Sequence, residues 1–195
     1  GAYTLMYSQN KTAKAGSIVQ EPCEVSDKYA SQVAEGYIKD ARQKIAATLK
    51  VDPKELIITS GGTESNNMAL IGTALAAKRK GNHIITTAVE HPSVKATASF
   101  LEEQGFRITF LSVDSRGQIS LEELKEALTP DTILVSIMYV NNEIGAVQPI
   151  EEIGKLLKNR ENPILFHVDA VQGYGKFRIL PKKLGIDMLS VSGHK

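Results

Sequence analysis

The stretch of sequence that decides the fold is residues 83–111, HIITTAVEHPSVKATASFLEEQGFRITFL. It begins with the β-branched run His83–Thr87 and ends with the apolar run Arg107–Leu111, and Pro92–Gln104 between them has helical periodicity. Gly105 is typical of the position just past a helix end. A strand, a helix and a second strand in this order form the unit of a parallel sheet with helices packed on it.

The same alternation of β-branched runs and helical segments continues from about residue 30 to the end of the sequence. It predicts an α/β fold with a mainly parallel sheet flanked by helices. The expected strands are Leu56–Thr59, His83–Thr87, Arg107–Leu111, Ile133–Met138, Ile164–Val168 and Met188–Val191. The expected helices are Ser31–Leu49, Glu64–Lys80, Pro92–Gln104, Leu121–Leu128 and Pro149–Asn159. Thr63 is expected to cap a helix, Ser120 to begin a capping box with Glu123, and Gly81 to end the helix before it.

The composition is that of one soluble globular unit. Of the 195 residues, 42% are hydrophobic and 23% are charged. Lys and Arg number 23 against 22 Asp and Glu, a net charge of +1 with no block of like charges, so neither nucleic acid nor a membrane is expected as a partner. Apolar runs such as Ile133–Val140 are far shorter than the roughly 20 residues of a membrane span. No signal pattern opens the sequence, so we expect a cytoplasmic protein.

The N-terminal part of the sequence differs from the rest. Residues 1–25 include a polar stretch without a clear period, so we expect an irregular segment there. Cys23 is the only cysteine, which excludes an internal disulfide and a cysteine-based metal site, and no metal site is predicted.

A glycine-containing run, Ser60–Asn67, follows an expected strand and opens an expected helix. Its backbone N–H groups and the Thr63 hydroxyl lie where the positive end of a helix attracts an anion, which favours a phosphate site. The alternative is a plain strand-to-helix turn, because Gly-Gly-Thr is common and the lysine of a P-loop is missing.

His91 lies in Glu90-His91-Pro92, at the end of another expected strand, where open parallel sheets bind their ligands. A histidine there can stack on a planar ring. Without further context, a capping or solvated histidine is the more common outcome.

Two polar motifs follow the next two expected strands. Asn142 offers an amide to a ring hydroxyl or phenolate, although Asn and Gly in this motif are also turn formers. Asp169 can pair with a protonated pyridine nitrogen and keep the ring cationic, which makes the ring an electron sink. The alternative for Asp169 is a helix N-cap with Gln172 at the third helical position.

The final motif, Ser190–Lys195, ends a strand with two hydroxyls, a glycine, a histidine and an amine. A lysine amine forms a Schiff base with an aldehyde cofactor, whereas a lysine at a chain end is more often an exposed charge. Each of the five motifs is weak alone. Together they supply phosphate donors, a ring stacker, a hydroxyl partner, a carboxylate and an amine, the set that pyridoxal 5′-phosphate (PLP) needs.

These five motifs resemble those of the cysteine desulfurases in the class V, fold type I aminotransferase group. The matching runs are Thr59–Asn67, Glu90-His91, Val140–Gly145, His167–Gln172 and Ser192–Lys195, in the family's order. The resemblance implies that Lys195 forms the covalent link to PLP, Asp169 pairs with the pyridine nitrogen, and His91 stacks on the ring and assists proton transfer. It further assigns Asn142 and Gln172 to the ring oxygen. The phosphate would be held by Gly62, Thr63, Ser192 and His194.

The resemblance also implies a reaction and partners. The family removes sulfur from L-cysteine, giving L-alanine and an enzyme persulfide whose sulfur goes to an acceptor or scaffold protein in iron–sulfur cluster assembly and thiolation. A homodimer is implied as well.

Some family features are not matched. Family chains continue past the lysine into a small domain with a substrate-binding arginine and a nucleophilic cysteine loop, so residues 26–195 correspond to a PLP-binding large-domain portion without the small domain. Cys23 does not match the nucleophile, and the N-terminal segment differs from the family pattern. This chain alone is expected to be inactive. Two alternatives stay open: a selenocysteine lyase or other class V PLP enzyme, and a non-catalytic remnant acting as a binding or scaffold protein.

Overall fold

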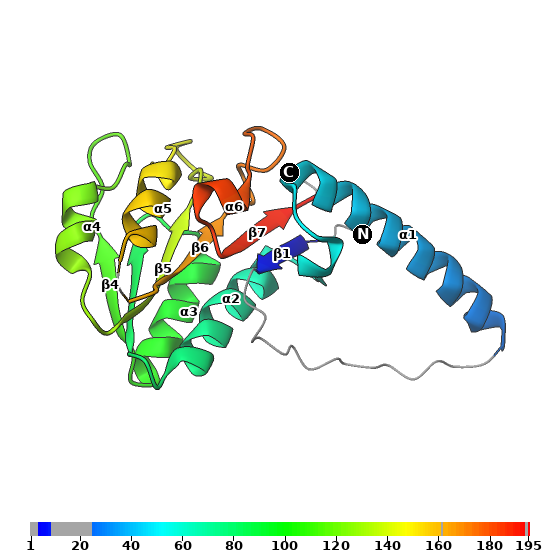
Figure 1. The fold of residues 1–195 in the computed structure, drawn as a ribbon, viewed down its shortest axis with the longest axis horizontal. Coiled ribbons are helices and arrows are strands. Elements are labelled where there is room, and N and C mark those ends of the chain that lie inside the picture. Colours follow the sequence, from blue (N-terminus) through cyan, green and yellow to red (C-terminus); the bar gives the residue numbers. More distant parts are fainter. Residues whose placement is uncertain (1–3, 9–24, 161, 194) are drawn as a thin grey trace.

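A computed structural model describes residues 4–8, 25–160, 162–193 and 195. The strands are β1 Thr4–Ser8, β2 Leu56–Thr59, β3 His83–Thr87, β4 Arg107–Leu111, β5 Thr132–Met138, β6 Leu165–Asp169 and β7 Met188–Ser192. The helices are α1 Val25–Leu49, η1 Pro53–Glu55, α2 Gly62–Ala77, α3 Pro92–Glu103, α4 Leu121–Ala127, α5 Ile150–Lys158 and α6 Pro181–Leu184. Figure 1 shows α1 extending away from the layered body of the molecule.

Within the described residues, the strands form one seven-stranded sheet in the order β2-β1-β7-β6-β5-β3-β4. Neighbours from β7 to β4 run parallel, with Val168 opposite Leu189 and Ile137 opposite Val168 in the register. In this part of the chain, β1 runs antiparallel to both strands that it pairs with, β2 and β7. The predicted α/β fold with a mainly parallel sheet is therefore confirmed.

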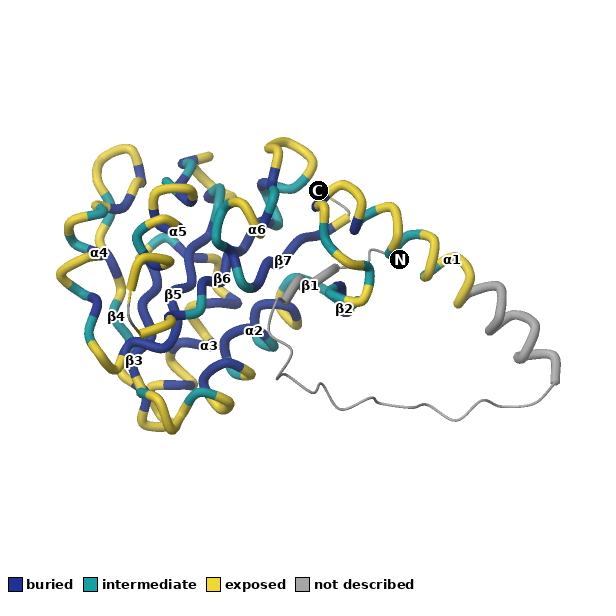
Figure 2. The backbone as a smooth tube through the Cα atoms, viewed as in Figure 1, coloured by how far each residue is buried: buried dark blue, intermediate teal, exposed yellow. Residues whose placement is uncertain are grey.

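Helices cover both faces of this sheet, as Figure 1 shows. Successive residues of a strand point to opposite faces, so the buried strands contribute side chains to a core on each side. Ile84 and Leu134 pack with α2 and α3, in a core that includes Leu70 and Val94. The alternate residues Ile85, Val135 and Ile137 pack in the second core with α4, α5 and the end of α1. Figure 2 shows β3 and β5 buried along their whole length between these layers. Among the described residues, no helix has both the length and the apolar character that crossing a membrane requires.

The prediction of an irregular N-terminal segment is wrong for residues 4–8, which form β1. This strand occupies the place between β2 and β7, and Thr4 lies opposite both Thr59 and Ser192. Its conformation comes from backbone pairing with strands far away in the sequence, which a five-residue run cannot reveal. Residues 9–24 of the predicted segment, including Cys23, lie outside the described part of the chain.

Two residues predicted to mark the ends of a helix do not do so in the structure. Thr63 is not the cap of α2, because the helix begins at Gly62 with Gly61 as N-cap. Gly81 does not end this helix, since α2 ends at Ala77. A Cβ on Gly81 would lie 2.2 Å from the carbonyl oxygen of Asp131, so close backbone packing requires the glycine there.

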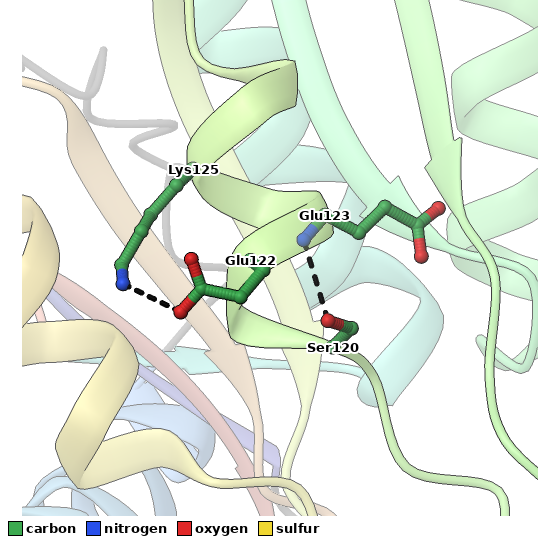
Figure 3. Close-up of polar contacts among 4 residues, drawn as sticks. All are labelled: Ser120, Glu122, Glu123 and Lys125. Carbon is green, nitrogen blue, oxygen red and sulfur yellow. Dashed lines mark hydrogen bonds and ion pairs between the residues drawn. The ribbon is translucent and has the colours of Figure 1, made fainter.

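The predicted capping box at α4 is half formed (Figure 3). Ser120 Oγ accepts a hydrogen bond from the backbone N–H of Glu123 at 3.3 Å. The Glu123 carboxylate instead accepts from the backbone N–H of Ser112 at 2.9 Å and from its hydroxyl at 2.6 Å. The side chain that would complete the box therefore anchors α4 to the end of β4.

Candidate active site

A cavity of about 270 Å³ lies where the parallel strands end at their carboxyl edge. Seven of the predicted site residues line it: Gly62, Thr63, His91, Asn142, Asp169, Gln172 and Lys195. They are joined there by Asn66, Ser93, Met138, Val140 and Val171. Residues that follow β2, β3, β5, β6 and β7 thus meet in one place, as parallel topology requires.

Asp169, the last residue of β6, supplies a buried carboxylate to this cavity and is only 6% exposed. Its Oδ2 accepts a hydrogen bond from Asn66 Nδ2 at 2.7 Å, and its Oδ1 accepts from the backbone N–H of Val171 at 3.0 Å. Burial raises the pKa of Asp169, and the two hydrogen bonds and nearby His91 oppose that rise in part. A cationic partner in the cavity would favour the ionised carboxylate further.

Asn66 and Ser93 connect this carboxylate to His91. Asn66 Nδ2 also donates to Ser93 Oγ at 3.0 Å, and Ser93 Oγ lies 2.8 Å from His91 Nδ1. The backbone N–H of Ser93 donates to the same ring nitrogen at 3.1 Å, which makes His91 the N-cap of α3. The capping alternative for His91 is therefore confirmed, and the same residue also lines the cavity.

Glu90 is a second buried carboxyl group next to His91 and is 3% exposed. Its Oε1 accepts from the Thr87 hydroxyl at 2.8 Å and from the backbone N–H of Met138 at 2.9 Å, which ties the end of β3 to the end of β5. Burial raises the pKa of Glu90 to about 8, against the lowering effect of these two bonds. At neutral pH the neutral acid is therefore the main form.

The loop that carries Asn142 is held by buried amides on either side. Asn141 Oδ1 accepts from the backbone N–H groups of Glu143 and Ile144, both at 2.9 Å, so the predicted turn is present. Gln148 is 2% exposed, donates to the Gly117 carbonyl at 2.6 Å and accepts from the Ile119 N–H at 3.0 Å. These bonds anchor the loop against the segment that precedes α4.

The first turn of α2 forms the side of the cavity that faces Val171. Gly62 and Thr63 both lie in this turn, whose N–H groups have no intrahelical acceptor. A Cβ on Gly62 would lie 3.3 Å from Val171 Cγ2, so a larger residue would crowd the lining. This end of the sixteen-residue helix offers N–H donors, the Thr63 hydroxyl and the positive end of the helix dipole.

Comparisons with known proteins agree with this arrangement. The family model described as "Aminotransferase class-V" matches residues 19–195. The chain belongs to the class-V aminotransferase family. It is 55% identical over 159 residues to the protein named "Putative cysteine desulfurase IscS 1" from Bacillus subtilis (strain 168), covering 82% of this chain and 41% of that protein.

Two solved structures of this kind share the fold. One, titled "SspA in complex with cysteine", has a TM-score of 0.80 and 40% identity, and the match covers 94% of this chain and 52% of that one. Another is a C-DES mutant with glycine covalently linked to the PLP cofactor, with a TM-score of 0.73, 25% identity, and 88% and 44% coverage. This class-V chain thus spans about half or less of the length of these relatives. Its predicted likeness to cysteine desulfurases is confirmed.

The three predicted site residues at the end of the sequence differ in how they relate to the cavity. Lys195 follows β7, is exposed and lines the cavity. Ser192 ends β7 and is 3% exposed, but it does not line the cavity as the structure describes it. His194 lies outside the described residues.

A buried histidine on β6, His167, connects the two neighbouring strands near the cavity. His167 Nδ1 lies 2.8 Å from Ser136 Oγ on β5, and its Nε2 lies 3.0 Å from Ser190 Oγ on β7. Burial lowers the pKa of His167 to about 3, so the ring is neutral near neutral pH. This bridge links β5, β6 and β7 two residues before Asp169.

Sequence reasoning missed the roles of Asn66, Ser93 and Glu90. Asn66 lies four residues after Gly62 on α2, which is the spacing of one helix face, so the pattern contained a signal for it. Ser93 and Glu90 flank the predicted site residue His91 by one or two positions. Their importance depends on what faces them across the cavity, and the sequence order does not show that.

Proposed function

We propose that this chain is the cofactor-binding part of a PLP-dependent cysteine desulfurase. The observation that carries the proposal is the meeting of the Asp169 carboxylate, His91 and Lys195 in one cavity. The class-V family match and the cysteine desulfurase relatives support the cofactor and the reaction class.

Buried acceptors in the cavity fit the cationic ring of PLP. Asp169 accepts two hydrogen bonds and forms no ion pair with the residues that the structure describes. Asn66 Oδ1 is likewise buried without a donor in that part of the chain. A protonated pyridine N–H would supply both a donor and a positive charge, which is what a buried carboxylate needs.

Each residue then has a defined task. Lys195 holds the aldehyde carbon, Asp169 receives the ring N–H, and Asn142 and Gln172 bind the ring oxygen. Gly62 and Thr63, with Ser192 and His194, hold the phosphate at the first turn of α2. When bound, PLP supplies an electron sink for negative charge at the substrate Cα.

The proposed substrate is L-cysteine, with L-alanine and persulfide sulfur as products. Support for cysteine comes from the SspA structure, whose title reports cysteine in a chain 40% identical to this one. The nucleophilic cysteine has no assigned residue in this chain, and Cys23 lies outside the described part. A homodimer and an acceptor protein for iron–sulfur cluster assembly are implied by the family resemblance alone. A cytoplasmic location is part of the proposal.

Equilibrium dialysis with PLP tests the proposal on the chain and its Asp169→Asn variant. Asparagine keeps the shape but removes the charge, so we expect PLP affinity to fall at least tenfold, which corresponds to about 1.4 kcal/mol. Asp131→Asn is the matched control, because Asp131 is exposed and does not line the cavity. Equal affinity in all three proteins, or no binding by the unmodified chain, would overturn the proposal.

A further inference from the structure

In the hydrogen bonds that connect Asp169 to His91, the carboxylate determines which atom is the donor and which is the acceptor at each step. Asp169 Oδ2 is an acceptor, so the Asn66 atom 2.7 Å away must be the NH₂ group. The second hydrogen of that NH₂ group points to Ser93 Oγ at 3.0 Å. Asn66 is 1% exposed, so its donors have no solvent to turn to.

Ser93 is the residue that connects Asn66 to the histidine ring. Its oxygen accepts from Asn66, which leaves the hydroxyl hydrogen free to donate to His91 Nδ1 at 2.8 Å. The backbone N–H of Ser93 donates to the same nitrogen at 3.1 Å. Two donors therefore converge on Nδ1, and a hydrogen on that atom would face another N–H.

We infer that Asn66 and Ser93 are positioning residues that keep His91 Nδ1 as an acceptor, so that the neutral ring carries its hydrogen on Nε2. A neutral imidazole has one donor nitrogen and one acceptor nitrogen, and the bond made by one nitrogen sets the role of the other. The chain Asp169–Asn66–Ser93–His91 thus couples the carboxylate to the ring tautomer.

This tautomer has a consequence that rests on the proposed function. His91 then offers a hydrogen-bond donor, Nε2–H, to the cofactor or substrate. It cannot accept a proton at Nε2 while Nδ1 is held as an acceptor. Ser93 and Asn66 thereby act on the reaction through His91 rather than by touching the reacting atoms.

Nitrogen NMR of the cofactor-free 195-residue chain, labelled with ¹⁵N-histidine, tests this inference. Long-range ¹H–¹⁵N correlation in mildly alkaline solution separates the two ring nitrogens, and His91→Gln identifies the His91 signals. We expect the Nε2–H pattern with a wide gap between the two nitrogen shifts. In Ser93→Ala only the backbone N–H still donates to Nδ1, so the gap should shrink in part as some of the second tautomer becomes populated. Asn66→Leu should shift it in the same direction because the Ser93 hydroxyl loses its orientation.

Ser93→Thr keeps the hydroxyl and should retain the wide gap. Circular dichroism of each variant shows whether it folds, and the unmodified chain alone decides the tautomer if a variant does not. An Nδ1–H pattern in the unmodified chain, or the same gap in folded Ser93→Ala and Asn66→Leu, would overturn the inference. PLP dialysis is independent of this result, so failure of the proposed function and failure of the tautomer inference are distinguishable.

Discussion

Asn66 Nδ2 donates to Asp169 Oδ2 at 2.7 Å, from the second turn of α2 to the end of β6. Asn66→Ala removes this donor and leaves a buried carboxylate oxygen unpaired. We expect the free energy of unfolding to fall by about 1–3 kcal/mol, measured by urea denaturation. The exposed Asn82→Ala is the control and should change it by less than about 0.5 kcal/mol. Equal losses in the two variants would show that the Asn66 bond is not stabilising.

Glu90 should make stability fall as the pH rises. Its pKa is raised from 4.5 to about 8 in the folded chain, so between these values the folded state holds a proton that the unfolded state has lost. The stability contributed by this group is therefore greatest in acid and decreases as the pH rises toward 8. Glu90→Gln stays neutral and keeps an acceptor for Thr87 and Met138.

The pH series for Glu90 compares urea unfolding of the two proteins at pH 5, 6.5 and 8. We expect the free energy of unfolding of Glu90→Gln to rise relative to that of the unmodified chain as the pH rises, by at most about 1.4 kcal/mol per pH unit. The difference between the proteins isolates Glu90, since the lowered pKa values of His83 and His167 affect both equally. Parallel profiles across the range would mean that Glu90 is ionised when buried.

Gly154 on α5 makes a close approach to α6 that predicts a steric effect. A Cβ there would lie 1.9 Å from the carbonyl oxygen of Leu184, and backbone cannot move aside cheaply. Gly154→Ala should therefore lower the free energy of unfolding by about 1–3 kcal/mol. Gly72→Ala, in α2 with nothing within 4 Å of its Cβ, is the matched control and should raise it by about 0.5–1 kcal/mol. A stabilising Gly154→Ala would contradict the packing described here.

The sheet was predictable where strands are apolar and bounded by turn residues. β2, β3 and β4 begin and end as predicted, because their residue types favour strands before any tertiary contact forms. β1 was not predictable, since its pairing partners Thr59 and Ser192 lie far away in the sequence. Tertiary backbone pairing decides its conformation.

The cavity was predictable for the same topological reason. His91 follows β3 and Asp169 ends β6, and parallel strands bring their carboxyl ends to one edge. The hydrogen bonds that connect these two residues were not predictable from the sequence. Asn66 donates to Asp169 from α2, and Ser93 donates to His91 from the start of α3. Contacts of this kind depend on how helices sit on the sheet.

The most direct test of the central claim is borohydride reduction of the chain with PLP, followed by peptide mapping. We expect one pyridoxyl adduct, on the peptide that contains Lys195. It should disappear in Lys195→Ala and persist in Lys125→Ala, an exposed lysine that does not line the cavity. An adduct spread over several surface lysines, or one unaffected by Lys195→Ala, would show that Lys195 is not the residue that holds PLP.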